Sequence, residues 1–318
     1  MKKYQVVVPT GIRPVAEAML QQVCDLRKWD NKEPLPLETL YQWMQDADGL
    51  FLTGHGVKVN SELFDHAPRL KVVAQAAAGY DNVDLCACRA RKVPFSNTPG
   101  VVVESTAELT FGIMLSAARR IHEGWNWVLS GKWEEAELPF GVNLFGKTLG
   151  IVGMGQIGAA VARRAKASGM KVVYHNRRRR PDESALEVQY MAFDELLAAA
   201  DFLVVLVPLS PESVNMFGAD QFAKMKPTAF FVNAARGGLV DTNALCDALQ
   251  SGKIAYAALD VIDTEPLPAS HPLLRLPNVL ITPHIGTLTA ETRNAMACLA
   301  AENLLAGLAG KPLLTGVD

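Results

Sequence analysis

Short runs of apolar residues alternate with helical patterns along the whole chain. In the first hundred residues, four runs have the length and composition of strands: YQVVVP, GLFLTG, KVVAQAA and PFSNTP. Amphipathic patterns lie between them near residues 14–23, 37–47 and 61–66. Strands that alternate with helices are typical of βαβ units, so this block predicts a parallel sheet.

A second block has the same alternation with longer apolar runs. Its strand candidates are TLGIVGMG, KVVYHN, DFLVVLVPL, TAFFVNA, AYAALDVI and NVLITPH. Each is apolar at nearly every position, which indicates strands covered by helices on both faces. The pattern therefore predicts an α/β protein with two Rossmann-like domains, each built on a doubly wound parallel sheet.

Two long helical segments decide the expected domain organisation. One runs from Glu104 to about Leu129, between the blocks, and the other follows the last strand of the second block. We expect the last helix to cross back to the first block. This predicts a discontinuous, flavodoxin-like substrate-binding domain of residues 1–98 and 288–318, a dinucleotide-binding domain of residues 99–287, and a cleft between the two.

Composition narrows the class of protein. Of 318 residues, 49% are hydrophobic and 20% charged, with a net charge of −2. This balance predicts a compact soluble protein, with no field that attracts nucleic acid or an anionic membrane. Five cysteines without a disulfide framework favour a reducing cytoplasm. Cys86 and Cys88 have no second Cys or His pair at zinc spacing, so we expect no metal.

A glycine motif stands at the first strand of the second block. Gly153, Gly155 and Gly158, with Gln156 and Ile157 between them, form GMGQIG after a strand and before a helix. The first glycine allows a tight turn, the second lets the backbone approach a pyrophosphate, and the third allows close packing of helix on strand. The strand–turn–helix context predicts a dinucleotide site rather than a ligand-free turn.

The end of the next strand distinguishes NAD from NADP. In place of the carboxylate that binds the ribose hydroxyls of NAD, Asn176 stands there, followed by Arg177, Arg178 and two more arginines. Guanidinium groups pair with a 2′-phosphate. We expect NADPH to be preferred and NADH to be possible, with Arg177 and Arg178 in contact and the last two arginines supplying only positive field. A solvated basic turn is the alternative.

Three more strand ends carry groups suited to reducing a keto acid. Arg236 follows FFVNAA, Glu265 follows LDVIDT, and His284 follows VLITP. A cation can bind the carboxylate and polarise the carbonyl, while an acid with a partner can protonate the developing alkoxide. Ligands bind at the carboxyl ends of strands in such sheets, so these side chains can converge.

Each of these three residues also has a structural interpretation, as a hydrogen-bonded histidine, a surface arginine and the start of a turn. We expect His271 to be structural, and His55, at a strand end of the first block, is a further candidate for the cleft.

The chain resembles the D-isomer-specific 2-hydroxyacid dehydrogenase family through several segments in order: AAAGYDNVD, GIVGMGQIG, FVNAARGGLVD, ALDVIDTEPL and TPHIGTLTAETR. Within the family it looks most similar to glyoxylate/hydroxypyruvate reductases, some of which also reduce 2-ketogluconate. The resemblance implies that hydride passes from NADPH to a 2-keto acid to give the D-2-hydroxy acid. It also implies a homodimer.

The resemblance assigns roles to residues of this chain. Arg236 binds the carboxylate and carbonyl, His284 is the acid–base, and Glu265 is the partner that favours its protonated form. Backbone amides near Ala78 and Gly79 bind the substrate carboxylate. The remaining assignments are to the cofactor: Thr106 on the phosphate side, Val207 and Pro208 on the adenine side, Asp260 at the nicotinamide, and Ala234, His284 and Gly286 beside them.

One departure from the family concerns substrate size. The animal hydroxypyruvate reductases carry a second tryptophan after their GW, whereas this chain keeps Trp133 and has Ala136 at that place. A roomier pocket makes 2-ketogluconate a candidate beside glyoxylate and hydroxypyruvate.

Three alternative functions remain on this scaffold. Phosphite oxidation suits the same three side chains, and formate oxidation suits them less because formate dehydrogenases place glutamine at the glutamate position. A dinucleotide-sensing corepressor keeps a similar triad but adds a disordered tail.

Overall fold

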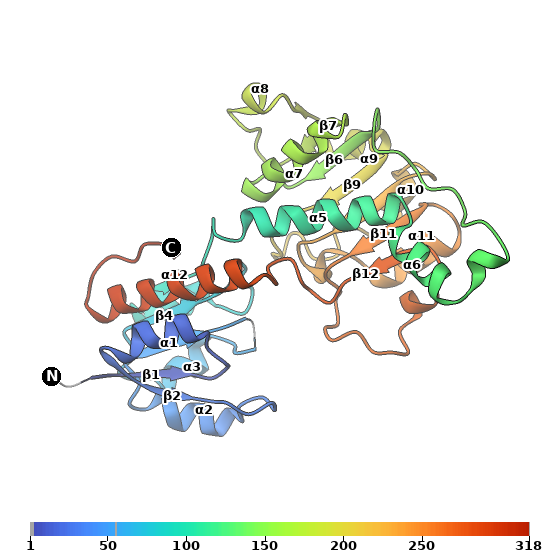
Figure 1. The fold of residues 1–318 in the computed structure, drawn as a ribbon. Coiled ribbons are helices and arrows are strands. Elements are labelled where there is room, and N and C mark those ends of the chain that lie inside the picture. The colour runs from blue at the N-terminus through green and yellow to red at the C-terminus, as the bar shows by residue number, and fades with distance from the viewer. Residues whose placement is uncertain (1–2, 55, 318) are drawn as a thin grey trace. The chain divides into compact units, whose positions relative to one another are not determined.

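The computed structural model describes residues 3–54 and 56–317. The chain divides into two compact units. Unit 1 contains the residues up to Val102 and those from Leu288 onward, and unit 2 is Val103–Thr287. The chain therefore leaves unit 1, forms all of unit 2, and returns (Figure 1).

Unit 1 is built on a six-stranded sheet. Its strands are β1 (Tyr4–Val8), β2 (Cys24–Lys28), β3 (Gly49–Leu52), β4 (Val72–Gln75), β5 (Phe95–Ser96) and β13 (Gly316–Val317). The strand order is β13-β5-β4-β3-β1-β2, with every pairing parallel except that of β13 with β5. Without β13 this is the 2-1-3-4-5 order of flavodoxin-like sheets.

The last helix of the chain covers one face of this sheet. The helices of unit 1 are α1 (Pro14–Gln21), α2 (Leu37–Met44), α3 (Ser61–Asp65), α4 (Leu85–Arg91) and α12 (Ala290–Leu308). In Figure 1, α12 runs beside α1, and both α1 and the strands β3 and β4 contact it. A Cβ atom at Gly307 would lie 2.5 Å from the Val72 side chain, so glycine lets α12 approach β4 closely.

Unit 2 is built on a seven-stranded parallel sheet. Its strands are β6 (Thr148–Val152), β7 (Lys171–His175), β8 (Gln189–Tyr190), β9 (Phe202–Val205), β10 (Phe230–Asn233), β11 (Tyr256–Leu259) and β12 (Val279–Ile281). The order β12-β11-β10-β9-β6-β7-β8 is the Rossmann order with one more strand at an edge. The expected α/β class with two Rossmann-like sheets is confirmed.

Helices cover both faces of this second sheet. They are α5 (Val103–Ala118), α6 (Ile121–Leu129), α7 (Gln156–Ala167), α8 (Glu183–Leu186), α9 (Phe193–Ala199), α10 (Ala219–Lys224) and α11 (Thr242–Gln250), with short 3-10 turns η1 (Lys132–Glu134), η2 (Gly237–Leu239) and η3 (Pro272–Arg275). In β9, Phe202 and Val204 face one core, while Leu203 and Val205 face the other. Burial on both sides explains why the central strands are apolar at nearly every position.

The long helix expected over residues 104–129 was wrong in one respect, because it is broken. Arg120 has a left-handed φ of 54°, and α6 begins at Ile121 in a new direction. The Ala118 carbonyl accepts a hydrogen bond of 2.7 Å from Val142 N. A returning segment thus satisfies a carbonyl at the end of α5. In addition, β2, β8 and β13 were not expected, because they are short or polar.

Among the described residues, no helix has both the length and the apolar character that a membrane span requires.

Candidate active site

The carboxyl ends of six strands, β6, β7, β9, β10, β11 and β12, lie at one level in unit 2. Val152 pairs with both His175 and Val205, and Asn233 pairs with both Val205 and Leu259. Leu259 in turn pairs with the end of β12. This register places the loops after β6, β7, β10, β11 and β12 along one edge of the sheet, where such folds bind ligands.

The glycine motif forms a tight turn between β6 and α7. Gly153 has a φ of +102°, and a Cβ atom there would lie 2.6 Å from the carbonyl carbon of Leu206. A Cβ atom at Gly158 would lie 2.6 Å from the Gly153 carbonyl oxygen, so helix and turn require glycine at both positions. At Gly155 a Cβ atom would meet no atom within 4 Å. The middle glycine thus faces open space in front of the N-terminus of α7, a surface that fits a pyrophosphate.

Residues that follow β7 form hydrogen bonds with the backbone of the glycine turn. Asn176 Oδ1 accepts a hydrogen bond of 2.7 Å from Met154 N, and its Nδ2 donates to the Met154 carbonyl. Arg180 Nη1 donates to the same carbonyl at 2.9 Å, and its guanidinium forms two hydrogen bonds of 2.7 Å with Asp182. Asn176 and Arg180 therefore fix the glycine turn to the basic turn.

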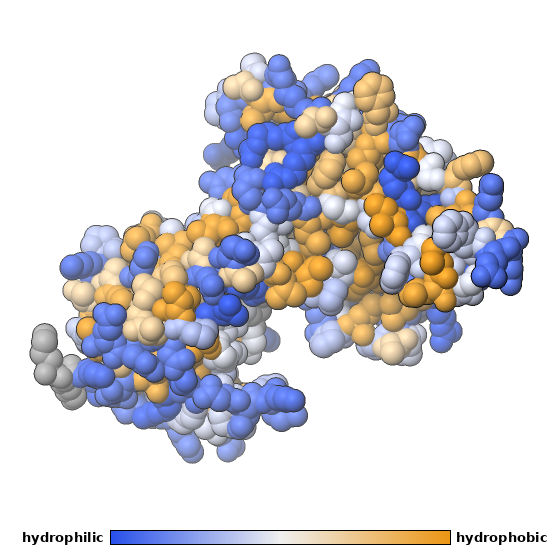
Figure 2. All heavy atoms as spheres, viewed as in Figure 1, coloured by the Kyte–Doolittle hydropathy of each residue, from blue (hydrophilic) through white to orange (hydrophobic). Residues whose placement is uncertain are grey.

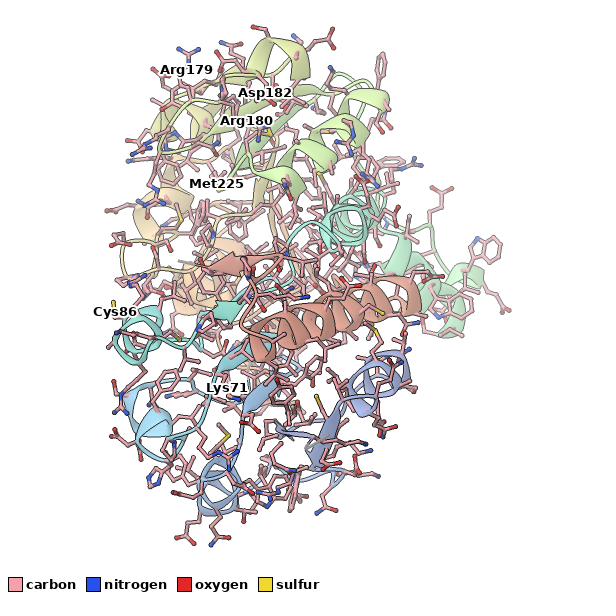
Figure 3. All side chains as sticks on the ribbon, turned by 90° about the vertical axis from the view of Figure 1, so that its left-hand side faces the viewer. Lys71, Cys86, Arg179, Arg180, Asp182 and Met225 are labelled. Atoms are coloured by element: carbon pink, nitrogen blue, oxygen red, sulfur yellow. The ribbon has the colours of Figure 1, made fainter. Side chains whose placement is uncertain are left out.

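The four arginines of the basic turn divide into two pairs. Arg179 pairs with Glu183 at 2.6 Å and stacks over Tyr190 at 5.2 Å, while Arg180 is engaged as above. Figure 3 shows Arg179 and Arg180 at the edge of unit 2. Arg177 and Arg178 are exposed, and Arg178 makes no hydrogen bond or ion pair within residues 3–54 and 56–317. Two arginines of the turn are thus held by carboxylates, and the two nearest the strand point to solvent.

His284 and Glu265 form a hydrogen-bonded pair between the loops that follow the neighbouring strands β11 and β12. His284 Nδ1 lies 2.8 Å from Glu265 Oε2, and Glu265 Oε1 accepts a hydrogen bond of 3.1 Å from Ile262 N. Burial pushes the pKa of Glu265 upward, but the bonds from His284 and Ile262 N, together with the charges of His284 and Arg236, hold it below its usual value. The carboxylate is thus kept ionised against the imidazole, and Nε2 stays available for another partner.

The backbone of His284 is strained and held by Asp260. His284 has a left-handed φ of 53°, and its N–H donates to the Asp260 carbonyl at 2.9 Å. The Asp260 carboxylate accepts from Thr282 Oγ1 at 2.6 Å and from Ile285 N and Gly286 N at 2.8 Å each. Burial raises the pKa of Asp260 although these three donors oppose it. Three backbone N–H groups and one hydroxyl of the loop that carries His284 therefore donate hydrogen bonds to Asp260.

Arg236 follows β10 and is placed by a close contact between two loops. A Cβ atom at Gly237 would lie 1.9 Å from the carbonyl carbon of Ile262, so only glycine lets the β10 loop touch the β11 loop. Asn233 Nδ2 donates to the Arg236 carbonyl at 2.9 Å. Ala234 is half-buried and lies between Asn233 and Arg236 in the sequence. Glu265 comes three residues after Ile262. The contact between Gly237 and Ile262 therefore brings the charge of Arg236 near the Glu265 carboxylate.

Thr106 and its neighbour lie beside the His284 loop. Ser105 Oγ donates to the Gly286 carbonyl at 2.8 Å, and a Cβ atom at Gly286 would lie 3.6 Å from Thr106 Cγ2. Val207 and Pro208 follow β9, next to the glycine turn. These positions surround the same strand edge.

The other predicted residues lie elsewhere. Ala78 and Gly79 are half-buried in the loop after β4, in unit 1. Trp133 and Ala136 are exposed near η1 of unit 2. His271 accepts a hydrogen bond of 3.2 Å from Leu273 N at the start of η3, which is a structural contact. His55 lies outside the described residues.

Sequence reasoning missed Asp182 and Thr282. Two acidic residues, separated from the four arginines by Pro181 alone, were a readable signal that some of these arginines have partners. Thr282 binds Asp260 across 22 positions of sequence, and no local pattern shows that contact. Across the described part of the chain, no group of three or more His, Cys, Asp or Glu is arranged to hold a metal ion.

Comparison with known proteins agrees with this geometry. The family described as D-isomer specific 2-hydroxyacid dehydrogenase, NAD binding domain, matches residues 111–286. A glyoxylate reductase of Aeropyrum pernix is 43% identical over 98% of this chain and 95% of its own length. A glyoxylate/hydroxypyruvate reductase B of Citrobacter koseri is 45% identical over 88% of this chain and 87% of its own.

A solved structure is similar over its full length. The NADPH-dependent glyoxylate/hydroxypyruvate reductase of Sinorhizobium meliloti, in complex with NADP and malonate, is 32% identical with a TM-score of 0.89 and covers 100% of this chain and 97% of that one. The strand order, the glycine turn and these matches lead to one conclusion: this chain belongs to the D-isomer-specific 2-hydroxyacid dehydrogenase family of NAD(P)-dependent oxidoreductases.

Proposed function

We propose that this protein is a reductase that prefers NADPH and converts glyoxylate and hydroxypyruvate into the corresponding D-2-hydroxy acids. The observation that carries the proposal is the hydrogen bond of 2.8 Å between His284 Nδ1 and Glu265 Oε2, at the strand edge that also holds the glycine turn. An imidazole paired with an ionised carboxylate, beside an arginine, supplies an acid and an electrophile for a keto acid.

The chain's own residues divide the chemistry among them. Arg236 binds the substrate carboxylate and polarises the keto carbonyl. Glu265 orients the imidazole of His284 through Nδ1, and Nε2 of His284 gives its proton to the oxygen that becomes the hydroxyl group. Bound NADPH supplies the hydride to the keto carbon.

The cofactor is held along the edge of the sheet in unit 2. The turn of Gly153, Gly155 and Gly158, with the first amides of α7 at Gln156 and Ile157, binds the pyrophosphate. Gly155 supports this assignment, because a Cβ atom there would meet no atom within 4 Å. The other assignments are Thr106 to the phosphate side, Val207 and Pro208 to the adenine, and Ala234, Asp260, His284 and Gly286 to the nicotinamide.

The basic turn supports the preference for NADPH. Asn176 is occupied with the glycine turn, and no carboxylate stands at the strand end to repel a 2′-phosphate. Arg177 and Arg178 are exposed, whereas the other two arginines already have carboxylate partners. Arg177 and Arg178 therefore bind the phosphate, as charged forks suited to it.

The substrate assignment follows the names of the relatives. The Aeropyrum protein is a glyoxylate reductase, and the Citrobacter protein is a glyoxylate/hydroxypyruvate reductase B. Within unit 1, the amides near Ala78 and Gly79 bind the substrate carboxylate, which makes unit 1 the substrate-binding domain and unit 2 the dinucleotide-binding domain. Ala136, in place of a second tryptophan, extends the proposal to 2-ketogluconate.

A panel of substrates and cofactors tests the function. Glyoxylate, hydroxypyruvate, pyruvate and 2-ketogluconate are each incubated with NADPH and with NADH, and loss of absorbance of the reduced cofactor is followed. We expect the highest kcat/KM for glyoxylate or hydroxypyruvate with NADPH. Absence of turnover with all four acids and both cofactors overturns the proposal.

A double variant tests the cofactor preference separately. In Arg177→Ala/Arg178→Ala, the Kd for NADPH should rise about 10- to 100-fold through the loss of charge-assisted hydrogen bonds, with the Kd for NADH unchanged. Arg275→Ala, an exposed arginine in η3, is the matched control. Equal losses for both cofactors would show that the two arginines do not recognise the 2′-phosphate.

We also propose a cytoplasmic homodimer. All five cysteines are free, which suits a reducing compartment. Large apolar side chains are exposed on α6 and along the segment that follows it: Ile121 at 57%, Trp125 at 64%, Leu129 at 65%, Trp133 at 73%, Phe140 at 94% and Phe145 at 80%. Figure 2 shows hydrophobic residues there. Such a surface is typical of an interface, and sedimentation of Trp125→Glu/Leu129→Glu should give the mass of one chain where the natural protein gives two.

A further inference from the structure

Arg293, the fourth residue of α12, is a half-buried arginine of unit 1. Its Nε atom is buried and has no hydrogen-bond partner. Within residues 3–54 and 56–317, its guanidinium group forms no hydrogen bond and no ion pair. An unpaired charge loses its hydration when it is buried, so Arg293 costs the fold free energy unless an anion from solution joins it.

A second arginine lies close to the first. Arg13 is the residue before α1, and its Nε donates a hydrogen bond of 3.0 Å to Oδ1 of Asn294, which follows Arg293 in α12. Burial, together with the charge of Arg13, lowers the pKa of Arg293 below its usual value. Asn294 contributes a neutral oxygen and no negative charge. Two guanidinium groups therefore repel each other at this place.

The acidic residues of the same two helices do not compensate this charge. Glu17, in the first turn of α1, forms an ion pair of 2.7 Å with Lys28. Glu291, in the first turn of α12, is exposed, and it makes no ion pair in the part of the chain that the structure describes. Both guanidinium groups are thus left without a carboxylate, which is the usual partner of an arginine that is partly buried.

The two arginines stand where two helices begin. The helices α1 and α12 pack against each other (Figure 1), and the bond from Arg13 to Asn294 joins their first turns. Side chains of a helix lean toward its N-terminus, so Arg293 extends toward the start of α12. Thr289 Oγ1 accepts one of the amides there. The dipole of this helix of 19 residues adds positive potential at the same end.

The place of Arg13 in the sheet is one where ligands bind. Arg13 lies in the short segment between β1 and α1, at the carboxyl edge of the sheet in unit 1. Thr10 of the same segment meets Thr53, which follows β3, with their Oγ1 atoms 2.5 Å apart. Open α/β sheets bind ligands outside the carboxyl ends of their strands. An anion beside Arg13 and Arg293 would occupy this edge.

We propose that Arg13 and Arg293 form a binding site for a phosphate group at the start of α12 in unit 1. A guanidinium group binds phosphate oxygens through paired, charge-assisted hydrogen bonds. A phosphate group carries close to two negative charges near neutral pH, which matches two arginines. The group comes from free inorganic phosphate or from a phosphorylated metabolite. The inference does not depend on the proposed function, because it concerns binding to unit 1 and not turnover.

Calorimetric titration of the full chain with inorganic phosphate tests the site. The protein is first saturated with NADPH, so that the phosphate-binding residues proposed for unit 2 are already occupied. Arg293→Met should raise the Kd for phosphate about 10- to 100-fold, through the loss of charge-assisted hydrogen bonds. Arg275→Met, at an exposed arginine of η3, is the matched control and should leave this Kd unchanged. Absence of phosphate binding to the natural protein, or an equal Kd in Arg293→Met, overturns the proposal.

Thermal unfolding gives a second measurement, in which the sign of the change is decisive. Without phosphate, Arg293→Met should raise Tm by about 1 to 4 °C, because it keeps an apolar stem and removes an unpaired buried charge. With phosphate, Tm of the natural protein should rise, since a ligand of the folded state stabilises it, and Tm of the variant should not. A lower Tm for the variant without phosphate would show that the guanidinium group is structural, and the proposal would fail.

Two additions complete the test. Arg13→Met changes an exposed side chain and should raise the Kd for phosphate about tenfold, so it decides the matter if Arg293→Met does not fold. Methyl phosphate distinguishes the two sources of the group. Binding of this ester at least as tight as that of inorganic phosphate assigns the site to a phosphorylated metabolite, and weaker binding assigns it to the free ion. A Kd that neither arginine variant changes contradicts both assignments.

Discussion

The loop after β12 in unit 2 and the loop after β4 in unit 1 both follow a parallel strand, but they expose opposite parts of the chain. In the first, the amides of residues 284–286 turn inward to Asp260, and the side chain of His284 is left outside. In the second, the carbonyls of residues 77–79 turn inward to Thr98, Asn97 and Gln75, and the amides are left outside.

The difference comes from the residue buried behind each loop. A carboxylate accepts hydrogen bonds and therefore draws N–H groups inward, whereas an amide side chain can donate and draw carbonyls inward. The buried partner thus decides whether a loop offers side-chain or main-chain chemistry. In unit 2 the result is an exposed imidazole, and in unit 1 it is a set of fixed dipoles.

The largest effect should come from the exposed side chain of the first loop. His284→Ala removes the proposed proton donor, and kcat should fall about 100- to 10,000-fold while the Kd for NADPH stays measurable. Steady-state kinetics and a binding titration measure the two quantities. His271→Ala, at a histidine of the same stretch whose ring accepts a hydrogen bond from Leu273 N, is the control. A near-normal kcat for His284→Ala would remove the acid–base role.

The carboxylate behind the first loop should have the next largest effect. Asp260→Asn places an NH2 group against the N–H groups of Ile285 and Gly286, so hydrogen bonds that hold the 282–286 loop are lost. His284 then no longer keeps its strained backbone conformation. We expect kcat to fall about 10- to 100-fold, from a buried donor left unpaired. The KM for glyoxylate should change less than kcat. The opposite ratio would mean that Asp260 does not act through His284.

Replacing the side-chain amide of Gln75, behind the loop after β4, should change KM more than kcat. Gln75→Glu places a carboxylate against the Gly79 carbonyl in a fully buried position. The KM for glyoxylate should rise about tenfold, with a smaller change in kcat, because main-chain binding is lost and the acid–base remains. A fall in kcat with an unchanged KM would contradict the comparison of the two loops.

The smallest effect concerns stability and pH. Burial by itself raises the pKa of Glu265. The hydrogen bonds from His284 and Ile262 N, with the charges of His284 and Arg236, outweigh burial and hold this pKa below its usual value. A carboxyl whose pKa is lowered in the folded protein stabilises the fold at pH values above its pKa in the unfolded chain, about 4.3. This contribution is lost as the pH falls through its pKa in the folded protein. Glu265→Gln should therefore lower Tm by about 1 to 3 °C at pH 7, a small shift because the pair is partly exposed, and by nothing near pH 3. Glu302→Gln, an exposed carboxyl on α12, should show no such pH dependence.

The sequence predicted the parts of unit 2 that use side chains at strand ends. Arg236, Glu265 and His284 each lie in the loop that follows an apolar strand, and parallel topology brings such loops to one edge. The glycine turn was equally readable, since its strand and helix are local. The break at Arg120 was not, because it depends on a segment that returns to Ala118 from residue 142.

Partners buried behind loops were the least predictable feature. Gln75 and Asn97 each donate to a loop carbonyl 4 and 19 positions away, and polar residues at strand ends have no pattern that says which group they bind. The basic turn was partly readable, because Asp182 and Glu183 follow the four arginines closely and pair with two of them.

The return of the chain to unit 1 also sets an order of events during synthesis. Unit 2 is one continuous stretch, and it can fold as soon as residue 287 has emerged from the ribosome. Unit 1 must wait for α12, which covers β3 and β4, and for Thr315, which orients Asn97. A nascent chain can therefore complete the fold of unit 2 while unit 1 still lacks α12 and the residue that orients Asn97, so the loop after β4 is among the last parts of the molecule to take its final form.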